Sequence, residues 1–126
     1  MSLLLLTHAL NQAEATTTEA TLQSLEPQTP AQVETYIRHQ FELNNLNPEL
    51  GVRLANCESG FVPQQSQHLN PKGPNGREDS WGVWQINLPY HPVTREQAMS
   101  VTWSTGYTIE KIKSGFKNWT CWPKGF

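Results

Sequence analysis

Two short segments of the sequence combine residue types that could perform acid–base chemistry. The first is Cys57–Phe61 and the second is Ser80–Asn87. Glu58 is expected at the C-terminal end of a helix, where the partial negative charge of the backbone carbonyls disfavours an ionised carboxylate. If Phe61 and nearby tryptophans also exclude water, the pKa of this carboxyl rises toward the range that a general acid needs. Glu58 is therefore the candidate catalytic residue.

The helix that would position Glu58 is marked at both ends. Asn47 followed by Pro48 is a start signal, because asparagine caps helices and proline is accepted at the first helical position. Apolar side chains then recur at helical spacing. Gly60 favours the left-handed backbone conformation that commonly ends helices. These signals predict a helix that closes immediately after Glu58.

Further helices are predicted on either side of this one. Thr29–Gln32 has the capping-box pattern, and apolar residues at helical spacing extend that helix to about Asn44. A second capping box at Thr94–Gln97 opens another helical region, which Gly106 would divide and Gly115 would end. The tail 119–122 is too aromatic for a free chain end, so we expect it to dock on the core.

An insert with many turn residues separates the helices. Proline, glycine and asparagine recur between residues 62 and 79, and Asn75-Gly76 favours a tight hairpin turn. A stretch of this length is typical of a functional loop or a small irregular sheet. The fold class is therefore mainly α, or α+β, with an irregular or small β-hairpin insert between helices.

Length and composition limit the classes of protein that remain. A chain of 126 residues fits one domain, and its net charge of −2 gives no basis for electrostatic attraction to nucleic acid. The four histidines show no ligand spacing and there is no His/Cys cluster, so we expect neither a metal nor a cofactor.

Residues 1–28 are expected to precede the folded domain, which would occupy residues 29–126. The run Leu3–Leu6, with Ala13-Glu14-Ala15 beyond it, resembles a secretory signal peptide but lacks a basic n-region. Export by this segment and an accidental likeness both stay open. The run is too short to span a bilayer as a helix. Residues 12–28 have the composition of a flexible linker.

Taken together, the two segments resemble the lysozyme-like superfamily, which includes animal-type lysozymes and the soluble lytic transglycosylases of bacteria and phages. The shared pattern is a Glu-Ser-x-Phe helix end, here Glu58–Phe61, followed by a Gly-x-x-Gln-Ile-Asn segment, here Gly82–Asn87. The likeness extends over residues 33–122. It implies a lysozyme-like fold and cleavage of the β-1,4 bond between N-acetylmuramic acid and N-acetylglucosamine in peptidoglycan.

The resemblance also implies roles for individual residues. Glu58 matches the catalytic acid, and Gln85 and Asn87 match positions that face the cleft and contact N-acetyl sugars. The plainer interpretations are a solvated glutamate near a helix end and two polar residues on an edge strand. Retention of Glu58 favours an enzyme over a non-catalytic glycan-binding domain of the same fold.

Other candidate substrate-binding residues depart from the family pattern. Ser80 stands where an animal-type lysozyme has an aspartate, and Asp79 precedes it, although Asp79 could simply cap a turn. Tyr107 lies in the region of the Ala-Tyr-Asn-Ala-Gly segment of transglycosylases without matching it. In an extended segment, the side chains of Asp79 and Ser80 point to opposite faces. Asp79 would then face away from the cleft unless a bulge near Gly82 turns it inward.

These departures favour a lytic transglycosylase, which needs no second carboxylate. Glu58 would act first as acid and then as base while the 6-hydroxyl of the sugar closes onto C1, giving 1,6-anhydromuramic acid. The alternative is a hydrolytic lysozyme. The expected partners are peptidoglycan glycan strands, met by a monomer without stable membrane insertion. The expected location is secreted or in the cell envelope (periplasm or cell wall), with a phage-associated setting as a further option.

Cys57 and Cys121 are the only cysteines, so only one intramolecular disulfide can form. An exported wall enzyme would meet an oxidising compartment, which favours the bond. It would tie the aromatic tail to the helix that carries Glu58. The alternative is two separately buried thiols.

Overall fold

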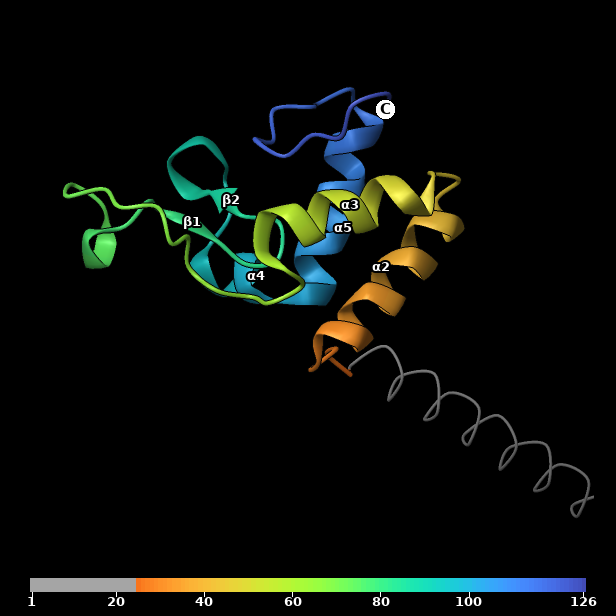
Figure 1. The fold of residues 1–126 in the computed structure, drawn as a ribbon, viewed down its shortest axis with the longest axis horizontal. Helices are drawn as coiled ribbons and strands as arrows, with labels where there is room; N and C mark the ends of the chain where they lie inside the picture. The colour runs from red at the N-terminus through yellow and green to blue at the C-terminus, as the bar shows by residue number, and fades with distance from the viewer. Residues whose placement is uncertain (1–24) are drawn as a thin grey trace, which may run out of the picture.

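A computed structural model describes residues 25–126, and the signal-like segment predicted within residues 1–24 lies outside the described residues. The described chain is helix-rich with a two-stranded antiparallel sheet, which confirms the mainly-α or α+β class (Figure 1). Its elements in order are α2 (Pro30–Leu43), α3 (Pro48–Ser59), η1 (Pro74–Gly76), β1 (Ser80–Trp81), β2 (Ile86–Asn87), η2 (Leu88–Tyr90), α4 (Arg95–Met99) and α5 (Val101–Lys113).

The first two helices begin and end where the sequence predicted. At the start of α2, the Thr29 side chain accepts a hydrogen bond from the Gln32 amide and the Gln32 side chain accepts one from the Thr29 amide. At the start of α3, the Asn47 side chain accepts from the amide of Glu49. Gly60 follows α3 with φ 63°, the left-handed conformation that its type favours. Glu58 is thus held in the last turn of a capped helix.

The helical region after Thr94 is divided at Ser100, so the prediction that Gly106 divides it is wrong. Ser100 is extended, with φ −73° and ψ 120°, and its hydroxyl accepts a hydrogen bond from the amide of Trp103 to begin α5. Gly106 lies inside α5. A residue that caps the next helix ends its predecessor more effectively than one glycine, which costs a helix only about 1 kcal/mol.

Glu26 ties the segment before α2 to the N-terminus of α5. Its carboxylate accepts hydrogen bonds from the amides of Val101 (2.8 Å) and Thr102 (3.1 Å), from the Ser100 hydroxyl (2.8 Å) and from the Thr102 hydroxyl. The first amides of a helix lack intrahelical partners, and a carboxylate satisfies them. Tertiary contacts therefore begin before Thr29, the expected start of the domain.

The core lies between α2, α3 and α5, with one tryptophan from the hairpin at its centre. Trp84 is fully buried, and its ring stacks on that of Phe41 with centroids 5.9 Å apart. Its indole N–H donates to the Thr105 hydroxyl on α5 at 3.1 Å. The C-terminal tail docks on the same residue, because the indole N–H of Trp119 donates to the Trp84 carbonyl at 3.1 Å. The docking predicted for the aromatic tail is confirmed.

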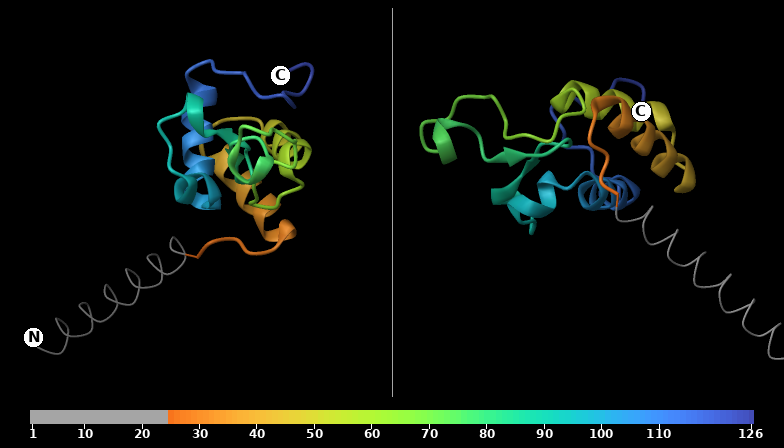
Figure 2. Two further views of the ribbon diagram at one scale, coloured as in Figure 1. Left: turned by 90° about the vertical axis from the view of Figure 1, so that its left-hand side faces the viewer. Right: turned by 90° about the horizontal axis from the view of Figure 1, so that it is seen from below.

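The loop 61–79 projects from the helices, and the hairpin of β1 and β2 joins its far end to the core (Figure 2). β1 and β2 pair with Trp81 opposite Ile86 and Ser80 opposite Asn87. Gly82 begins the turn between the strands with φ +85°, and a Cβ atom there would lie 1.8 Å from the Ala98 carbonyl oxygen of α4. Only glycine fits this close approach, which fixes the hairpin against the helices.

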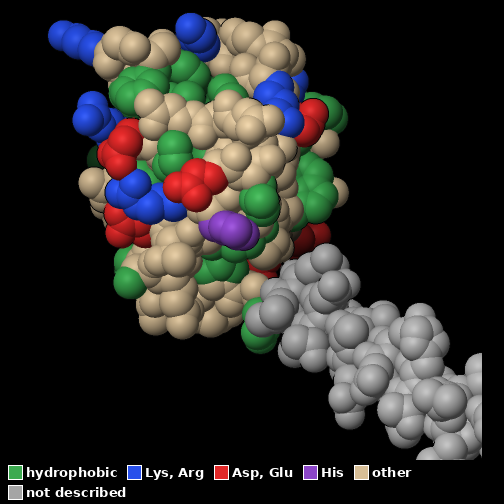
Figure 3. Space-filling view, turned by 90° about the vertical axis from the view of Figure 1, so that its right-hand side faces the viewer, with side chains coloured by type: hydrophobic (Ala, Val, Ile, Leu, Met, Phe, Trp, Pro, Cys, Tyr) green, Lys and Arg blue, Asp and Glu red, His purple; other side chains and the backbone are tan. Residues whose placement is uncertain are grey.

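Charges of both signs are interspersed on the α2 side of the molecule (Figure 3). Arg38 of α2 lies 2.6 Å from Glu49 of α3 and 3.6 Å from Glu34 one turn earlier. These pairs are largely solvent-exposed, so each contributes little to stability. None of the helices in the described part of the chain has the length and apolar composition needed to cross a membrane.

Candidate active site

A cleft of about 540 Å³ opens between the end of α3, the projecting loop with its hairpin, and the C-terminal tail. Residues 57–59 line it from α3, and residues 64–68 line it from the projecting loop. The hairpin adds residues 85–87, and the opposite wall comes from Tyr107 of α5 and from residues 116 and 118–121 of the tail. Three parts of the chain that are distant in sequence therefore meet around Glu58.

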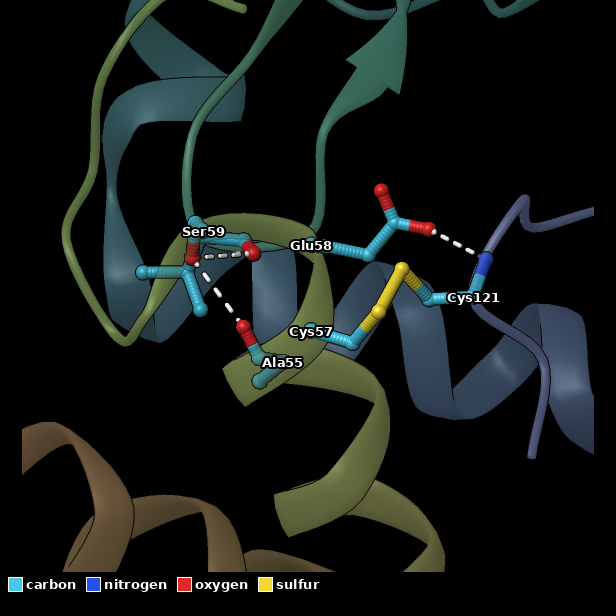
Figure 4. Close-up of a disulfide and its surroundings, with 6 residues drawn as sticks. Ala55, Cys57, Glu58, Ser59 and Cys121 are labelled. Carbon is cyan, nitrogen blue, oxygen red and sulfur yellow. Dashed lines mark hydrogen bonds between the residues drawn. A yellow bond between two sulfur atoms is a disulfide. The ribbon is translucent and has the colours of Figure 1, made fainter.

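Glu58 projects from the last turn of α3 toward the tail (Figure 4). The backbone N–H of Cys121 donates to its Oε1 at 3.0 Å. The other carboxyl oxygen, Oε2, points away from the disulfide (Figure 4). The hydroxyl of Ser59 lies 2.7 Å from the carbonyl of Val83, which ties the end of α3 to the hairpin. The Cys121 N–H therefore holds the carboxyl itself, and Ser59 fixes the helix end from which the carboxyl projects.

Burial raises the pKa of Glu58 above that of an ordinary glutamate, because a half-buried carboxylate loses hydration. The hydrogen bond from the Cys121 N–H acts in the opposite direction, since it stabilises the charged form. The negative charge of Glu78 raises the pKa further, and His68 lowers it. The net rise keeps a larger fraction of Glu58 protonated near neutral pH, as a general acid requires.

The predicted disulfide between Cys57 and Cys121 is confirmed, and the alternative of two separate thiols is wrong. The two Cα atoms lie 5.8 Å apart, within the usual range for a disulfide. Because Cys57 directly precedes Glu58, the bond attaches the tail to α3 beside the candidate acid. Both cysteines line the cleft.

Four of the predicted substrate-binding residues, Ser80, Gln85, Asn87 and Tyr107, line the same cleft as Glu58. Asp79 is not among the described residues that line it. Its carboxylate instead accepts a hydrogen bond from the Trp81 indole at 2.7 Å.

The two amide residues of the hairpin are placed differently. Gln85 has φ 51°, and its side-chain NH₂ donates to the carbonyls of Gln64 (3.0 Å) and Gly82 (2.9 Å). The Gln85 side chain therefore stabilises the turn. Asn87 has a buried Oδ1 with no hydrogen-bond partner among the described residues. Buried polar atoms are normally satisfied, so Asn87 is the better placed of the two to accept from a ligand.

Glu78 is a cleft residue that the sequence reasoning did not select. It lines the cleft, and the Ser80 hydroxyl, itself buried, donates to its Oε1 at 2.8 Å. Alternate residues of an extended segment share a face. The spacing of Glu78 and Ser80 was therefore the signal that could have found it. Among the residues that the structure describes, two carboxylates line the cleft, Glu58 and Glu78.

The opposite wall of the cleft is aromatic. Nδ1 of His91 lies 2.7 Å from the Tyr107 hydroxyl, and its ring packs edge-on against Phe116. Burial lowers the pKa of His91, and the nearby Lys111 charge lowers it further, so the neutral imidazole is favoured. Phe116 in turn packs edge-on against Trp119. Flat aromatic surfaces beside hydrogen-bonding groups suit a ligand with both apolar and polar faces.

Within residues 25–126 no three His, Cys, Asp or Glu side chains come together as ligands for a metal ion. Comparisons of the chain with known protein families, with curated proteins and with solved structures found no match.

Proposed function

We propose that this protein cleaves β-1,4 glycosidic bonds in the glycan strands of peptidoglycan, with Glu58 as the general acid and with a lysozyme-like fold. One observation carries the proposal: a half-buried carboxyl lines an open cleft, where burial raises its pKa. A protonated carboxyl in that position can donate to the leaving glycosidic oxygen as positive charge develops on the sugar ring.

The composition of the cleft supports a carbohydrate substrate. Side chains that donate and accept hydrogen bonds line one side, among them Gln64, Gln67 and Asn87. Tyr107 and Trp119 give the other side aromatic surface. Sugars with acetamido groups offer donors and acceptors around an apolar ring face, which is the complementary pattern. A disulfide also fits a secreted or cell-envelope protein.

The product depends on what attacks C1 of the sugar. In the transglycosylase reaction, Glu58 gives its proton to the leaving oxygen and then takes the proton of the 6-hydroxyl. That oxygen bonds to C1, so the strand ends in a 1,6-anhydro sugar and no water is consumed. The engagement of Asp79 by Trp81 supports this reaction, because Asp79 is then not directed to the substrate.

Glu78 favours hydrolysis as the alternative. A retaining hydrolase has a second carboxylate roughly 5 Å from the acid, and an inverting one has it at roughly 6.5–9.5 Å with a water between. Glu78 lines the cleft and raises the pKa of Glu58 by its charge, so it is the available second carboxylate. We favour the transglycosylase reaction, and the products released from peptidoglycan distinguish it from hydrolysis.

The test is digestion of purified peptidoglycan followed by mass spectrometry of the soluble fragments. Anhydro ends are lighter than reducing ends by one water. We expect anhydro ends from the wild type and from both Glu78→Gln and its neighbour control Asp79→Asn. Reducing ends that disappear in Glu78→Gln but persist in Asp79→Asn would establish the hydrolase. Binding of the strands without release of any fragment would mean a glycan-binding domain and end the enzymatic proposal.

A further inference from the structure

The Cys57–Cys121 disulfide and the Cys121 amide converge on one carboxyl. Cys57 precedes Glu58 on α3, and the disulfide crosses from there to the tail. The N–H of the residue at the far end of this bond donates to Glu58 Oε1 at 3.0 Å (Figure 4). The covalent link and the hydrogen bond therefore close a small ring of contacts around the candidate acid.

We infer that the disulfide is a positioning element for Glu58: it holds the Cys121 N–H against Oε1 and so keeps the transferable proton on Oε2, the oxygen that points away from the disulfide. The inference rests on the proposed role of Glu58 as general acid. It assigns Cys57 and Cys121 a part in the reaction rather than in stability alone.

The chemistry of a neutral carboxyl gives the reason. Its proton resides on one oxygen, and the other oxygen is an acceptor. An N–H donor aimed at Oε1 makes Oε1 the acceptor and leaves the proton on Oε2. A general acid must bring that proton within hydrogen-bond reach of the leaving oxygen. Without the donor, the carboxyl samples orientations in which the proton is on the wrong oxygen.

Noncovalent contacts of the tail do not replace this link. Trp119 is fixed by its hydrogen bond to the Trp84 carbonyl, but Lys117, Asn118 and Thr120 are exposed. Without the disulfide, Trp119, Trp122 and Phe126 still pack the tail against the core, but no covalent bond fixes the Cys121 N–H beside Glu58. The position of the N–H then depends on the packing of these neighbours and on its own hydrogen bond.

The same hydrogen bond has an electrical consequence that can be measured. It stabilises ionised Glu58 and so opposes the effect of burial on the pKa. The other titratable groups that line the cleft are Glu78, His68, His91 and Tyr107. None of them is changed by removal of the disulfide. Because Trp119, Trp122 and Phe126 keep the tail packed, Glu58 keeps the burial that raises its pKa, and loss of the Cys121 N–H contact alone moves that pKa upward.

The experiment compares the wild type with the double variant Cys57→Ser/Cys121→Ser. The rate constant kcat/KM is measured against pH on soluble peptidoglycan fragments, and the Glu58 pKa is measured independently by carboxyl NMR titration. We expect the alkaline limb of the profile and the NMR pKa to move to higher pH. The maximum value of kcat/KM should fall by between about tenfold and a hundredfold, because a displaced catalytic group loses that much rate.

A control separates positioning from loss of fold. Glu26→Gln weakens a cap whose residues do not line the cleft. The kcat/KM of this variant should therefore follow its folded fraction, while the alkaline limb of its pH profile stays in place. If the double serine variant does not fold, Cys57→Ala/Cys121→Val replaces it, because apolar side chains fill the space of the disulfide. The same upward shift of the alkaline limb and of the Glu58 pKa is expected.

The outcomes distinguish this inference from the proposed function. If the wild type cleaves peptidoglycan but neither the limb nor the Glu58 pKa moves in a folded double variant, the positioning role is refuted and the catalytic role stands. If the wild type cleaves no peptidoglycan, the catalytic role is refuted and the positioning role falls with it.

Discussion

The hydrogen bonds of Glu26 predict a stability that depends on pH. Its carboxylate accepts from two backbone amides and two hydroxyls at the N-terminus of α5, the helix that carries Tyr107 into the cleft. Glu26→Gln keeps the shape of the side chain but removes its charge. An N-terminal cap contributes about 1 kcal/mol, and the helix dipole adds about 0.3–1 kcal/mol for a charged group. We expect a loss of about 1–2 kcal/mol at pH 7.

The sign of the pH dependence follows from the pKa of Glu26. Burial alone would raise this pKa, but the hydrogen bonds from Thr102, Ser100 and Val101 outweigh it and lower the pKa below the ordinary value of 4.5. A lowered pKa in the folded state means stabilisation that is present above the unfolded pKa and is lost as pH falls through the folded pKa. The difference between wild type and Glu26→Gln should therefore shrink on acidification below about pH 4.

Thermal unfolding followed by calorimetry at neutral and acidic pH measures both effects. A loss of about 1 kcal/mol lowers Tm by roughly 4–8 °C in a domain of this size. Glu110→Gln is the matched control, because Glu110 lies on the same helix in an exposed pair with Lys113 at 3.9 Å and should change Tm little. An equal Tm for Glu26→Gln and the wild type at pH 7, or a deficit that does not change with pH, would refute this account of the cap.

Further predictions concern the packing that supports the site. Gly82→Ala should lower the free energy of unfolding by more than about 2 kcal/mol, because its φ is +85° and the added Cβ would meet the Ala98 carbonyl. Gly106→Ala should raise it by about 0.5–1 kcal/mol, since no atom lies within 4 Å of the added Cβ and the site is helical; urea titration of both variants decides. Phe41→Ala should cost about 3–5 kcal/mol by opening a cavity beside Trp84, and a cost under 1 kcal/mol would contradict the packing.

Local signals predicted the helix that carries Glu58 because its boundaries depend on neighbouring residues alone. Asn47, Pro48 and Gly60 act through their own backbone preferences and nearby amides, and the structure has them as expected. The disulfide was predictable because only one pairing exists. Ser100 shows the limit of such reasoning. The helical region breaks at Ser100, which caps α5, and not at Gly106, where the break was expected.

The arrangement of the site depended on distant contacts that no local pattern contains. Asp79 turns to Trp81, while Glu78 faces the cleft and is held there by the Ser80 hydroxyl. The pairing of His91 with Tyr107 joins two segments that are 16 residues apart in the sequence and meet through tertiary packing. The hydrogen bond from the Cys121 N–H to Glu58 likewise follows from where the tail docks.

The most direct test of the central claim compares release of soluble fragments from purified peptidoglycan by the wild type and by Glu58→Gln. The amide retains an oxygen that can accept from the Cys121 N–H but has no acidic proton to donate. Because the pKa of Glu58 is raised, its ionised form is disfavoured in the fold, so the variant should be at least as thermally stable at pH 7. We expect release to fall by about a hundredfold or more with glycan binding retained. Release by a folded Glu58→Gln variant at the wild-type rate would contradict the account.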